Sequence, residues 1–401
     1  VQVNARCGSE GICGGCLVIL EEGQFVVANQ RVTADRDHPL LVLACQVELA
    51  DCEATIRFPR KSIVEREAKI DEDFRLTQFT HEAQTRKIVV RVPRPDTAPA
   101  RSAWESIDIE LQLQLGHQDC ELPLDCLQKL AEALADEGQL TVTMGRTGKR
   151  WSVIDVEPGD TGQSHFAVAV DLGTTTVVAI LVEMSEGKVV QTASSYNQQI
   201  RRADDVASRI AYCRSAEHVQ DLQRLVIQET VNTLIETLCT EQEISADGIS
   251  RIAISGNTVM THLFLGISPK SIGQLPFRPV ANRHDKYRAR DLELRINPLG
   301  MVDVIPSVSG YVGGDIVSDI YVARLIKRRE PTLLVDIGTN GEMVYSENGE
   351  FTVCATAAGP AFEGYGTTHG CRAATGAIEH ISYGSDLQFE NRVIGGSHAT
   401  G

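Results

Sequence analysis

The stretch AVAVDLGTTTVVAILVE, residues 167–183, decides the fold of the region around it. An apolar, β-branched run leads to Asp171, breaks at Gly173 and three threonines, and then resumes as a second apolar run. Two strand-like runs joined by a Gly/Thr turn predict a β-hairpin. The backbone N–H groups and hydroxyls of the turn suit a phosphate, and the adjacent carboxylate suits a hydrated Mg²⁺. For one copy, an ordinary hairpin with a polar tip is an equally good interpretation.

A second copy of the pattern, TLLVDIGTNGEMVYSE, covers residues 332–347. Asp336 follows Asp171 by 165 positions, which is a repeat of domain size. Two copies in order, at this spacing, favour a paired phosphate site over two unrelated hairpins. The candidate phosphate-binding residues are Gly173, Thr174, Thr175 and Thr176 in the first turn, and Gly338, Thr339, Asn340 and Gly341 in the second.

The paired motifs DLGTTT and DIGTNGE resemble the two phosphate motifs of the superfamily of actin, sugar kinases and heat-shock-chaperone ATPases. The resemblance implies two similar lobes with ATP and Mg²⁺ between the hairpins, and Asp171 and Asp336 holding the hydrated metal. In that superfamily a carboxylate in the connecting region orients the attacking water or the metal. Asp315 in GYVGGDIVSD is the candidate here, and a plain helix N-cap is the alternative.

Two further glycine-containing turns come directly after predicted strands. In SRIAISGNTVM a strand ends at Ser255, and Gly256, Asn257 and Thr258 open a helix, which suits either an anion contact or a simple N-cap. In VDVIPSVSGYVGGDIV the corresponding glycines are Gly313 and Gly314.

For other segments of the same region, the sequence predicts structure but few binding residues. A helix from about 218 to 239 has an apolar stripe made of Leu222, Leu225, Val226, Leu234 and Leu238. The preceding YNQQIRRADDVASRIAYC reads as a polar connection. In the glycine-rich GPAFEG, we expect Glu363 and Gly364 to line the cleft.

Composition excludes some classes of function. The 401 residues are 42% hydrophobic and 23% charged, as in ordinary globular proteins. The net charge of −16 argues against nucleic acid or an anionic membrane as the main partner. Asp171, Gly173 and the threonines interrupt the most apolar window, so we predict no membrane span. No secretory signal is visible, and the 11 cysteines are too dilute for a disulfide scaffold, which favours the cytoplasm.

The N-terminal segment carries a second strong signal, RCGSEGICGGC, followed by LACQ. Four thiolates with glycines between them can hold a 2Fe–2S cluster, here through Cys7, Cys13, Cys16 and Cys45. A zinc site is the alternative, and Cys52 is a second candidate for the fourth ligand. The spacing resembles the adrenodoxin-like variant of β-grasp ferredoxins, without the opening hairpin, and both ends of the sequence look clipped.

The predicted fold class is therefore multidomain, α+β and α/β. The units are a partial β-grasp 2Fe–2S ferredoxin (1–60), a linker (61–86), a small α+β middle domain (87–158) and an actin-like (ribonuclease H-like) ATPase. Its lobes span 165–330 and an incomplete 331–401. In the middle domain we expect a helix with Leu124, Leu127, Leu130 and Leu134 on one face.

This order of domains resembles the reductive activators of corrinoid proteins. The resemblance implies an ATP-hydrolysing enzyme with a 2Fe–2S cluster, ATP and Mg²⁺ as cofactors, which returns the Co(II) of a corrinoid protein to Co(I). It also implies a low-potential electron donor such as ferredoxin or flavodoxin, and leaves the oligomeric state open, a homodimer being one option.

Two other functions stay open at this stage. One is an ATP-driven activator of an acyl-CoA dehydratase or reductase, whose relatives share a 4Fe–4S cluster between two subunits. The other is a ferredoxin-type electron carrier with a module that binds a nucleotide or a partner without hydrolysis. A sugar kinase is a weak third reading, because it leaves the cysteine-rich segment unexplained.

Overall fold

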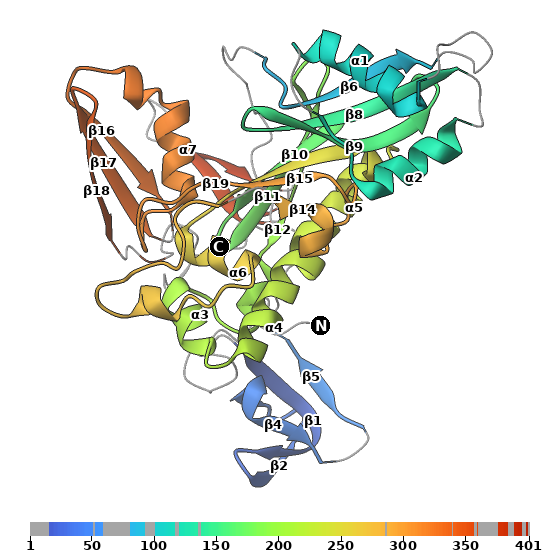
Figure 1. Ribbon diagram of the computed structural model, residues 1–401. Coiled ribbons are helices and arrows are strands. Elements are labelled where there is room, and N and C mark those ends of the chain that lie inside the picture. The colour runs from blue at the N-terminus through green and yellow to red at the C-terminus, as the bar shows by residue number, and fades with distance from the viewer. Residues whose placement is uncertain are drawn as a thin grey trace.

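Five β-sheets organise the part of the chain that the computed structural model describes (Figure 1). The described residues are 16–50, 53–58, 81–92, 101–116, 120–134, 138–284, 287–338, 340–356, 359, 376–383, 389–394 and 398–399. Within them no helix is both long and apolar enough to cross a membrane.

The N-terminal sheet is antiparallel and is built around its long first strand, β1 (Leu17–Val27). Its neighbours are β2 (Gln30–Ala34), β3 (Leu40–Leu43), β4 (Val47–Leu49) and β5 (Thr55–Arg57). Val18 and Leu20 alternate inward along β1, and Phe25 is buried beyond the register shift between Leu20 and Glu22; with Ala34 these residues form a small core.

The second sheet has the strand order β6-β8-β9-β7 and two helices. Its elements are β6 (Thr85–Arg91), α1 (Ala103–Leu115), β7 (Cys120–Glu121), α2 (Leu124–Ala133), β8 (Gln139–Thr147) and β9 (Arg150–Pro158). A capping box between Ser102 and Glu105 fixes the start of α1.

The buried face of α2 differs from the prediction. Leu130 is buried as expected, but Leu124, Leu127 and Leu134 are 65%, 45% and 39% exposed. Cys126, Leu130 and Ala133 face the sheet instead. The predicted leucine stripe was wrong because contact with β9 decides which face of α2 is buried. The small side chains of Cys126 and Ala133 allow that face to pack closely against the strand.

The large central sheet has the strand order β12-β11-β10-β13-β15-β14. Its strands are β10 (Phe166–Leu172), β11 (Thr176–Glu183), β12 (Lys188–Tyr196), β13 (Ile249–Ser255), β14 (Tyr287–Arg288) and β15 (Met301–Val304). β10 and β11 pair antiparallel with Leu172 opposite Val177, which confirms the first predicted hairpin. β10, β13 and β15 run parallel, so their carboxyl ends lie at one edge of the sheet.

Helices pack on this sheet with the predicted apolar stripe inward. They are α3 (Val206–Tyr212), α4 (Ala216–Val226), a π-helical turn (Ile227–Val231), α5 (Asn232–Glu241) and α6 (Thr258–Phe264). All five residues of the stripe are at most 3% exposed, which confirms that prediction. Short 3₁₀ turns occur at Ala44–Gln46, Gln198–Arg201, Ala246–Gly248, Lys270–Gly273, Ala289–Leu292 and Leu325–Lys327.

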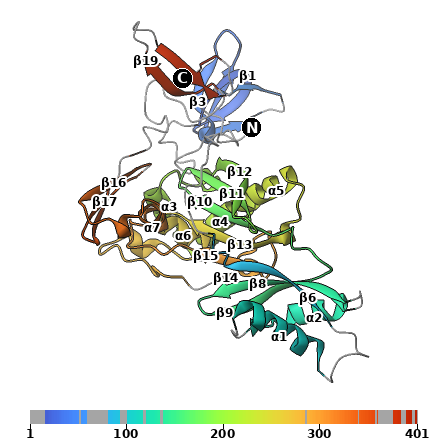
Figure 2. The ribbon, with the colours of Figure 1, turned by 90° about the horizontal axis from the view of Figure 1, so that it is seen from above.

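The second sheet docks on the β14–β15 edge of the central sheet. Leu299 and Met301 belong to the same core cluster as the inward side chains of β8 and β9. Arg288 donates to Ser152 at 2.8 Å, and Asn297 donates to the buried Asp155 at 2.6 Å. Figure 2 shows the central sheet between this unit and the N-terminal sheet.

A fourth sheet carries the second predicted hairpin. Its strands are β16 (Thr332–Ile337), β17 (Gly341–Glu347) and β18 (Glu350–Thr356), all antiparallel. α7 (Gly314–Val322) packs beside it, and Val312, Ile316, Leu325 and Val344 form their common core (Figure 1). A last hairpin consists of β19 (Ile378–Tyr383) and β20 (Phe389–Val393).

The buried His165, just before β10, gives folding a measurable pH dependence. Burial and the Lys87 charge lower the pKa of its ring to about 4, from about 6.5 in an unfolded chain. Below about pH 6.5 the unfolded chain takes up a proton on this ring, whereas the folded protein does so only near pH 4. The free energy of unfolding therefore falls between these pH values, by on the order of 3 kcal/mol in all. We predict that the difference in unfolding free energy between wild type and His165→Gln narrows from pH 7 to pH 5. Urea titrations at both pH values measure it, and a constant difference would contradict the assignment.

Candidate functional site

Three turns meet at the carboxyl edge of the central sheet. β10 leads into residues 173–176, β13 into 256–258, and the segment after β15 into 313–315. Because the three strands are parallel, these turns lie side by side. Ligands of α/β sheets commonly bind at this edge.

The first turn is very tight. A Cβ atom on Gly173 would lie 2.2 Å from the carbonyl oxygen of Thr176, so only glycine fits there. The Asn197 side chain donates to the Gly173 carbonyl at 2.9 Å, and Thr174 is 6% exposed. The Asn197 side chain and the packing around Thr174 therefore hold the turn on its buried side.

The second turn is hydrogen-bonded to the first. Asn257 caps α6 by accepting from the Met260 N–H at 3.0 Å, and its amide donates to the Thr174 hydroxyl at 3.0 Å. Thr258 is buried and donates its hydroxyl to the Ser309 carbonyl at 2.6 Å. The side chains of Asn257 and Thr258 therefore bind protein groups, and the N-cap interpretation describes their contacts.

The third turn packs against the second backbone to backbone. The Gly314 N–H donates to the Gly256 carbonyl at 2.9 Å. A Cβ on Gly313 would lie 2.4 Å from the Asn257 Cα, so any side chain would push the turns apart. Gly313 is the N-cap residue of α7, and Asp315 lies in the first turn of the helix. Asp315 accepts from the Ile316 N–H at 2.8 Å.

The second hairpin adds its own turn to this edge. β16 and β17 pair with Asp336 opposite Glu342 and Ile337 opposite Gly341, which confirms the second predicted hairpin. Directly opposed residues share a face of the sheet. The Gly338 N–H donates to the Asn340 carbonyl at 3.0 Å across the turn, and Thr339 lies outside the described residues.

Five carboxylates from the two hairpins and α7 influence one another. Burial, followed by neighbouring carboxylates, raises the pKa of Asp171 and Asp315 to about 6 and that of Glu342 to about 7. Burial and the Asp336 charge raise the pKa of Asp319. Like charges act most strongly at short range, so the carboxylates of the two hairpins lie within reach of one another's charge.

Asp336 is central to this group. Burial raises its own pKa, and its charge raises the pKa of the other four, Asp171, Asp315, Asp319 and Glu342. The Asp171 side chain is open to solvent, although protein surrounds it closely enough to desolvate its carboxylate. Several carboxylates within reach of one another's charge, one of them open to solvent, attract a cation.

Sequence reasoning missed Asp319 and Glu342. Asp319 follows Asp315 by four residues, so both lie on one face of α7. Glu342 is 7% exposed, and the DIGTNGE motif places it directly opposite Asp336. Both signals were present in the sequence, but they needed the helix and the strand register to be known first.

The described side chains contain no group of three or more His, Cys, Asp or Glu that is close enough to bind a metal ion together. Mg²⁺ typically keeps several waters and binds through one or two carboxylates plus substrate phosphates. The carboxylates here fit a hydrated ion of that kind, as oxygen donors of high negative charge beside glycine-rich turns.

Two of the four predicted cluster cysteines come together. The Sγ atoms of Cys16 and Cys45 are 3.4 Å apart, and the Ala44 N–H donates to the Cys16 carbonyl at 2.8 Å. A disulfide would need about 2.05 Å. Two thiolates bound to one tetrahedral metal at about 2.3 Å lie roughly 3.8 Å apart, so this pair fits metal ligation. Cys7 and Cys13, like Glu363 and Gly364, lie outside the described residues.

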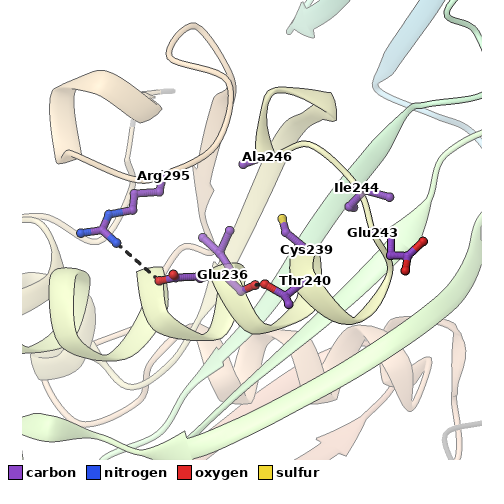
Figure 3. A pocket seen from close by; sticks show the side chains of 8 residues that line it. Glu236, Cys239, Thr240, Glu243, Ile244, Ala246 and Arg295 are labelled. Atoms are coloured by element: carbon purple, nitrogen blue, oxygen red, sulfur yellow. Dashed lines mark hydrogen bonds and ion pairs between the residues drawn. The ribbon is translucent and has the colours of Figure 1, made fainter.

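A surface pocket of about 480 Å³ lies elsewhere, on α5 (Figure 3). Glu236 and Arg295 form an exposed ion pair at its rim, at 3.6 Å. The adjoining Ala246 precedes the amino end of β13, whereas the glycine turns follow its carboxyl end, Ser255. The pocket is thus separated from the carboxylates by the length of a strand, and it contains none of the predicted site residues.

Family models match most of the chain. They are described as the RACo linker region, over residues 75–163, the RACo middle region, over 166–328, and the C-terminal domain of RACo, the ASKHA domain, over 330–401. The predicted middle domain, 87–158, falls within the region that the first of these models names the linker.

Individual relatives agree with these models. A corrinoid activation enzyme, RamQ, from Eubacterium limosum is 29% identical over 95% of this chain. A [Co(II) methylated amine-specific corrinoid protein] reductase from Methanosarcina barkeri is 23% identical over 53% of it. The chain spans 60% and 40% of the lengths of these two relatives. A solved structure, a reductive activator for corrinoid, iron–sulfur protein, is 32% identical with a TM-score of 0.74, over all of this chain and 66% of its own.

Proposed function

The chain belongs to the RACo family of reductive activators of corrinoid proteins, and from that premise we propose that it is an ATP-dependent enzyme that reduces the Co(II) of a corrinoid protein to Co(I). The names of its relatives support this activity. The observation that carries it is the group of five carboxylates from two glycine-turn hairpins and α7, in which the charge of Asp336 acts on the other four.

In this proposal the two hairpins bind the phosphates of ATP. Backbone N–H groups of the turns at 173–176 and 338–341 supply the contacts, except that of Gly338, which already donates to the Asn340 carbonyl. The Thr174 and Asn257 side chains do not take part, because they already bind each other. Asp171 and Asp336 face the hydrated Mg²⁺. Asp315 and Glu342, whose pKa values are raised, would accept a proton from the attacking water.

The N-terminal unit would hold the redox group. Cys16 and Cys45 provide two adjacent thiolates, and Cys7 and Cys13 are the other two proposed ligands. When bound, a 2Fe–2S cluster supplies a one-electron carrier near about −400 mV. The thiolate donors and their separation also suit zinc, so metal content is part of the test.

The need for ATP follows from the energetics of electron transfer. For one electron, each step of about 59 mV uphill costs about 1.4 kcal/mol, so a shortfall of a few hundred millivolts is several kcal/mol. Nucleotide binding between two lobes favours one arrangement of the lobes over another. If the corrinoid protein binds only the favoured arrangement, the free energy of nucleotide binding can offset the cost of the uphill electron transfer.

The direct test mixes the protein with a corrinoid protein in the Co(II) state, Mg-ATP and a low-potential reductant. The visible spectrum of the corrinoid then reports the appearance of Co(I). We expect Co(I) only when ATP and the protein are both present, and ATP hydrolysis that the corrinoid protein stimulates. Hydrolysis that is absent under every condition would contradict the proposal and would favour an electron carrier with a nucleotide-binding module.

A further inference from the structure

Arg209 is a completely buried arginine directly behind the first glycine turn. Its hydrogen bonds go to neutral acceptors: the Thr174 carbonyl at 2.6 Å, the Gln199 side-chain oxygen at 3.0 Å and the Ala203 carbonyl at 3.1 Å. Its Nη1 also lies 2.8 Å from the Met260 sulfur. One guanidinium thus joins the turn to the loop after β12 and to α6.

A buried polar scaffold surrounds this side chain. Gln199 donates to the Leu222 carbonyl at 2.9 Å, and Asn197 holds the Gly173 carbonyl. The π-helical turn lets the Thr230 hydroxyl reach back to the Leu225 carbonyl at 2.9 Å and accept from the Gln198 N–H at 3.1 Å. π turns of this kind are frequent at functional sites.

The charge of Arg209 needs a reason beyond packing. Burial lowers its pKa to about 10, and the nearby charges that favour its protonated form are Asp204 and Asp205. A buried charge is costly unless it is paired, and neutral residues can satisfy backbone carbonyls more cheaply. Where the turn binds a polyphosphate, attraction between the guanidinium and that anion offsets the cost of burying the charge.

We propose that Arg209 is a positioning residue of the nucleotide site: its guanidinium fixes the Thr174 carbonyl, and with it the turn at 173–176, in the orientation that binds a polyphosphate, and adds positive charge behind it. The inference rests on the proposed ATP site. It assigns to Arg209 both the shape of the first phosphate turn and part of the affinity for the anion.

The first test compares Arg209→Lys with Arg288→Lys. Arg288 is partly buried and, like Arg209, donates to a carbonyl and a side-chain oxygen, here those of Leu299 and Ser152, but it lies on the edge strand β14, away from the glycine turns. Lysine keeps the charge but cannot span three acceptors. We expect Arg209→Lys to weaken Mg-ADP binding, measured by calorimetry, about tenfold. In the nucleotide-free protein it should also speed amide hydrogen exchange at residues 173–176. Arg288→Lys should change neither quantity, even if it lowers the melting temperature as much as Arg209→Lys does.

The second test keeps Arg209 and neutralises it. Met260→Glu places a carboxylate where the sulfur now meets the guanidinium, and Met260→Gln is its neutral match. We expect Met260→Glu to bind Mg-ADP several-fold more weakly than Met260→Gln at similar stability. This pair decides the question if Arg209→Lys does not fold.

The outcomes separate this inference from the proposed function. If wild type binds no Mg-ADP, the ATP site is wrong, and faster exchange at 173–176 in Arg209→Lys still supports the positioning of the turn. Unchanged exchange and affinity in Arg209→Lys, or equal affinities in the Met260 pair, would overturn the role of Arg209.

Discussion

Asp336→Asn is expected to lower ATP hydrolysis at least about a hundredfold and to abolish corrinoid reduction with it, while the visible spectrum of the cluster stays unchanged. Asp336 raises the pKa of all four of its acidic neighbours, so its charge acts on each of them. Asparagine keeps the shape and removes the charge that would face Mg²⁺. Losing one preorganised electrostatic contact commonly costs a factor of 10²–10³.

A second expected effect of the same variant is independent of turnover. Without the Asp336 charge, the pKa of Glu342 should fall, because repulsion from Asp336 is one of the causes that raise it. Infrared titration of the carboxyl groups in the metal-free protein measures that fall. It separates a lost charge from a distorted hairpin.

The matched control is Asp303→Asn. Asp303 is also a strand carboxylate, on β15, but it pairs with Arg251 at 2.5 Å. We expect this variant to lose some stability and to keep its hydrolysis rate. Hydrolysis near the wild-type rate in Asp336→Asn, or an equal loss in both variants, would remove Asp336 from the site.

The two hairpins could be predicted because their signal is local. Apolar alternation predicts the strands, and Gly173 and Gly338 mark the turns within the same dozen residues. The cap at Asn257 is local in the same sense. The resemblance to a family then placed the two turns opposite each other, which the pKa values of Asp171 and Asp315 support.

The supporting groups could not be predicted in this way. Arg209 is 35 residues from Thr174 and lies in a stretch whose sequence indicates only a polar connection. Only the fold of α3 against the loop after β12 buries it. The exposed Leu124 shows the converse case, since an apolar residue at helical spacing was placed on the buried face and lies on the other side.

The separation of the units has a consequence for electron transfer. The N-terminal sheet has its own core, distinct from the cores of the central sheet and of the sheet on its β14–β15 edge. A change at the thiols should therefore leave nucleotide binding intact. The proposed redox and nucleotide functions could then be disabled one at a time, and only their coupling would require both.

Cys45→Ser is expected to remove the cluster and, with it, all corrinoid reduction, while Mg-ADP affinity stays at the wild-type value. Cys45 lies 3.4 Å from Cys16 through their sulfurs, in the turn after β3. A serine hydroxyl is a poor substitute for a thiolate ligand of iron, and the variant would keep only three of the four proposed ligands. Iron and sulfide analysis, the visible spectrum and calorimetry with Mg-ADP measure the three effects.

Cys354→Ser is the control for this change, because Cys354 is an exposed thiol on β18, far along the chain from the N-terminal sheet. We expect it to keep two irons and two sulfides per chain, as a 2Fe–2S cluster requires. A full complement of iron in Cys45→Ser would show that Cys45 is not a ligand and would return Cys52 to consideration. Zinc without sulfide in the wild type would replace the redox site by a structural one, because zinc carries no electrons, and the activity would then need another electron carrier.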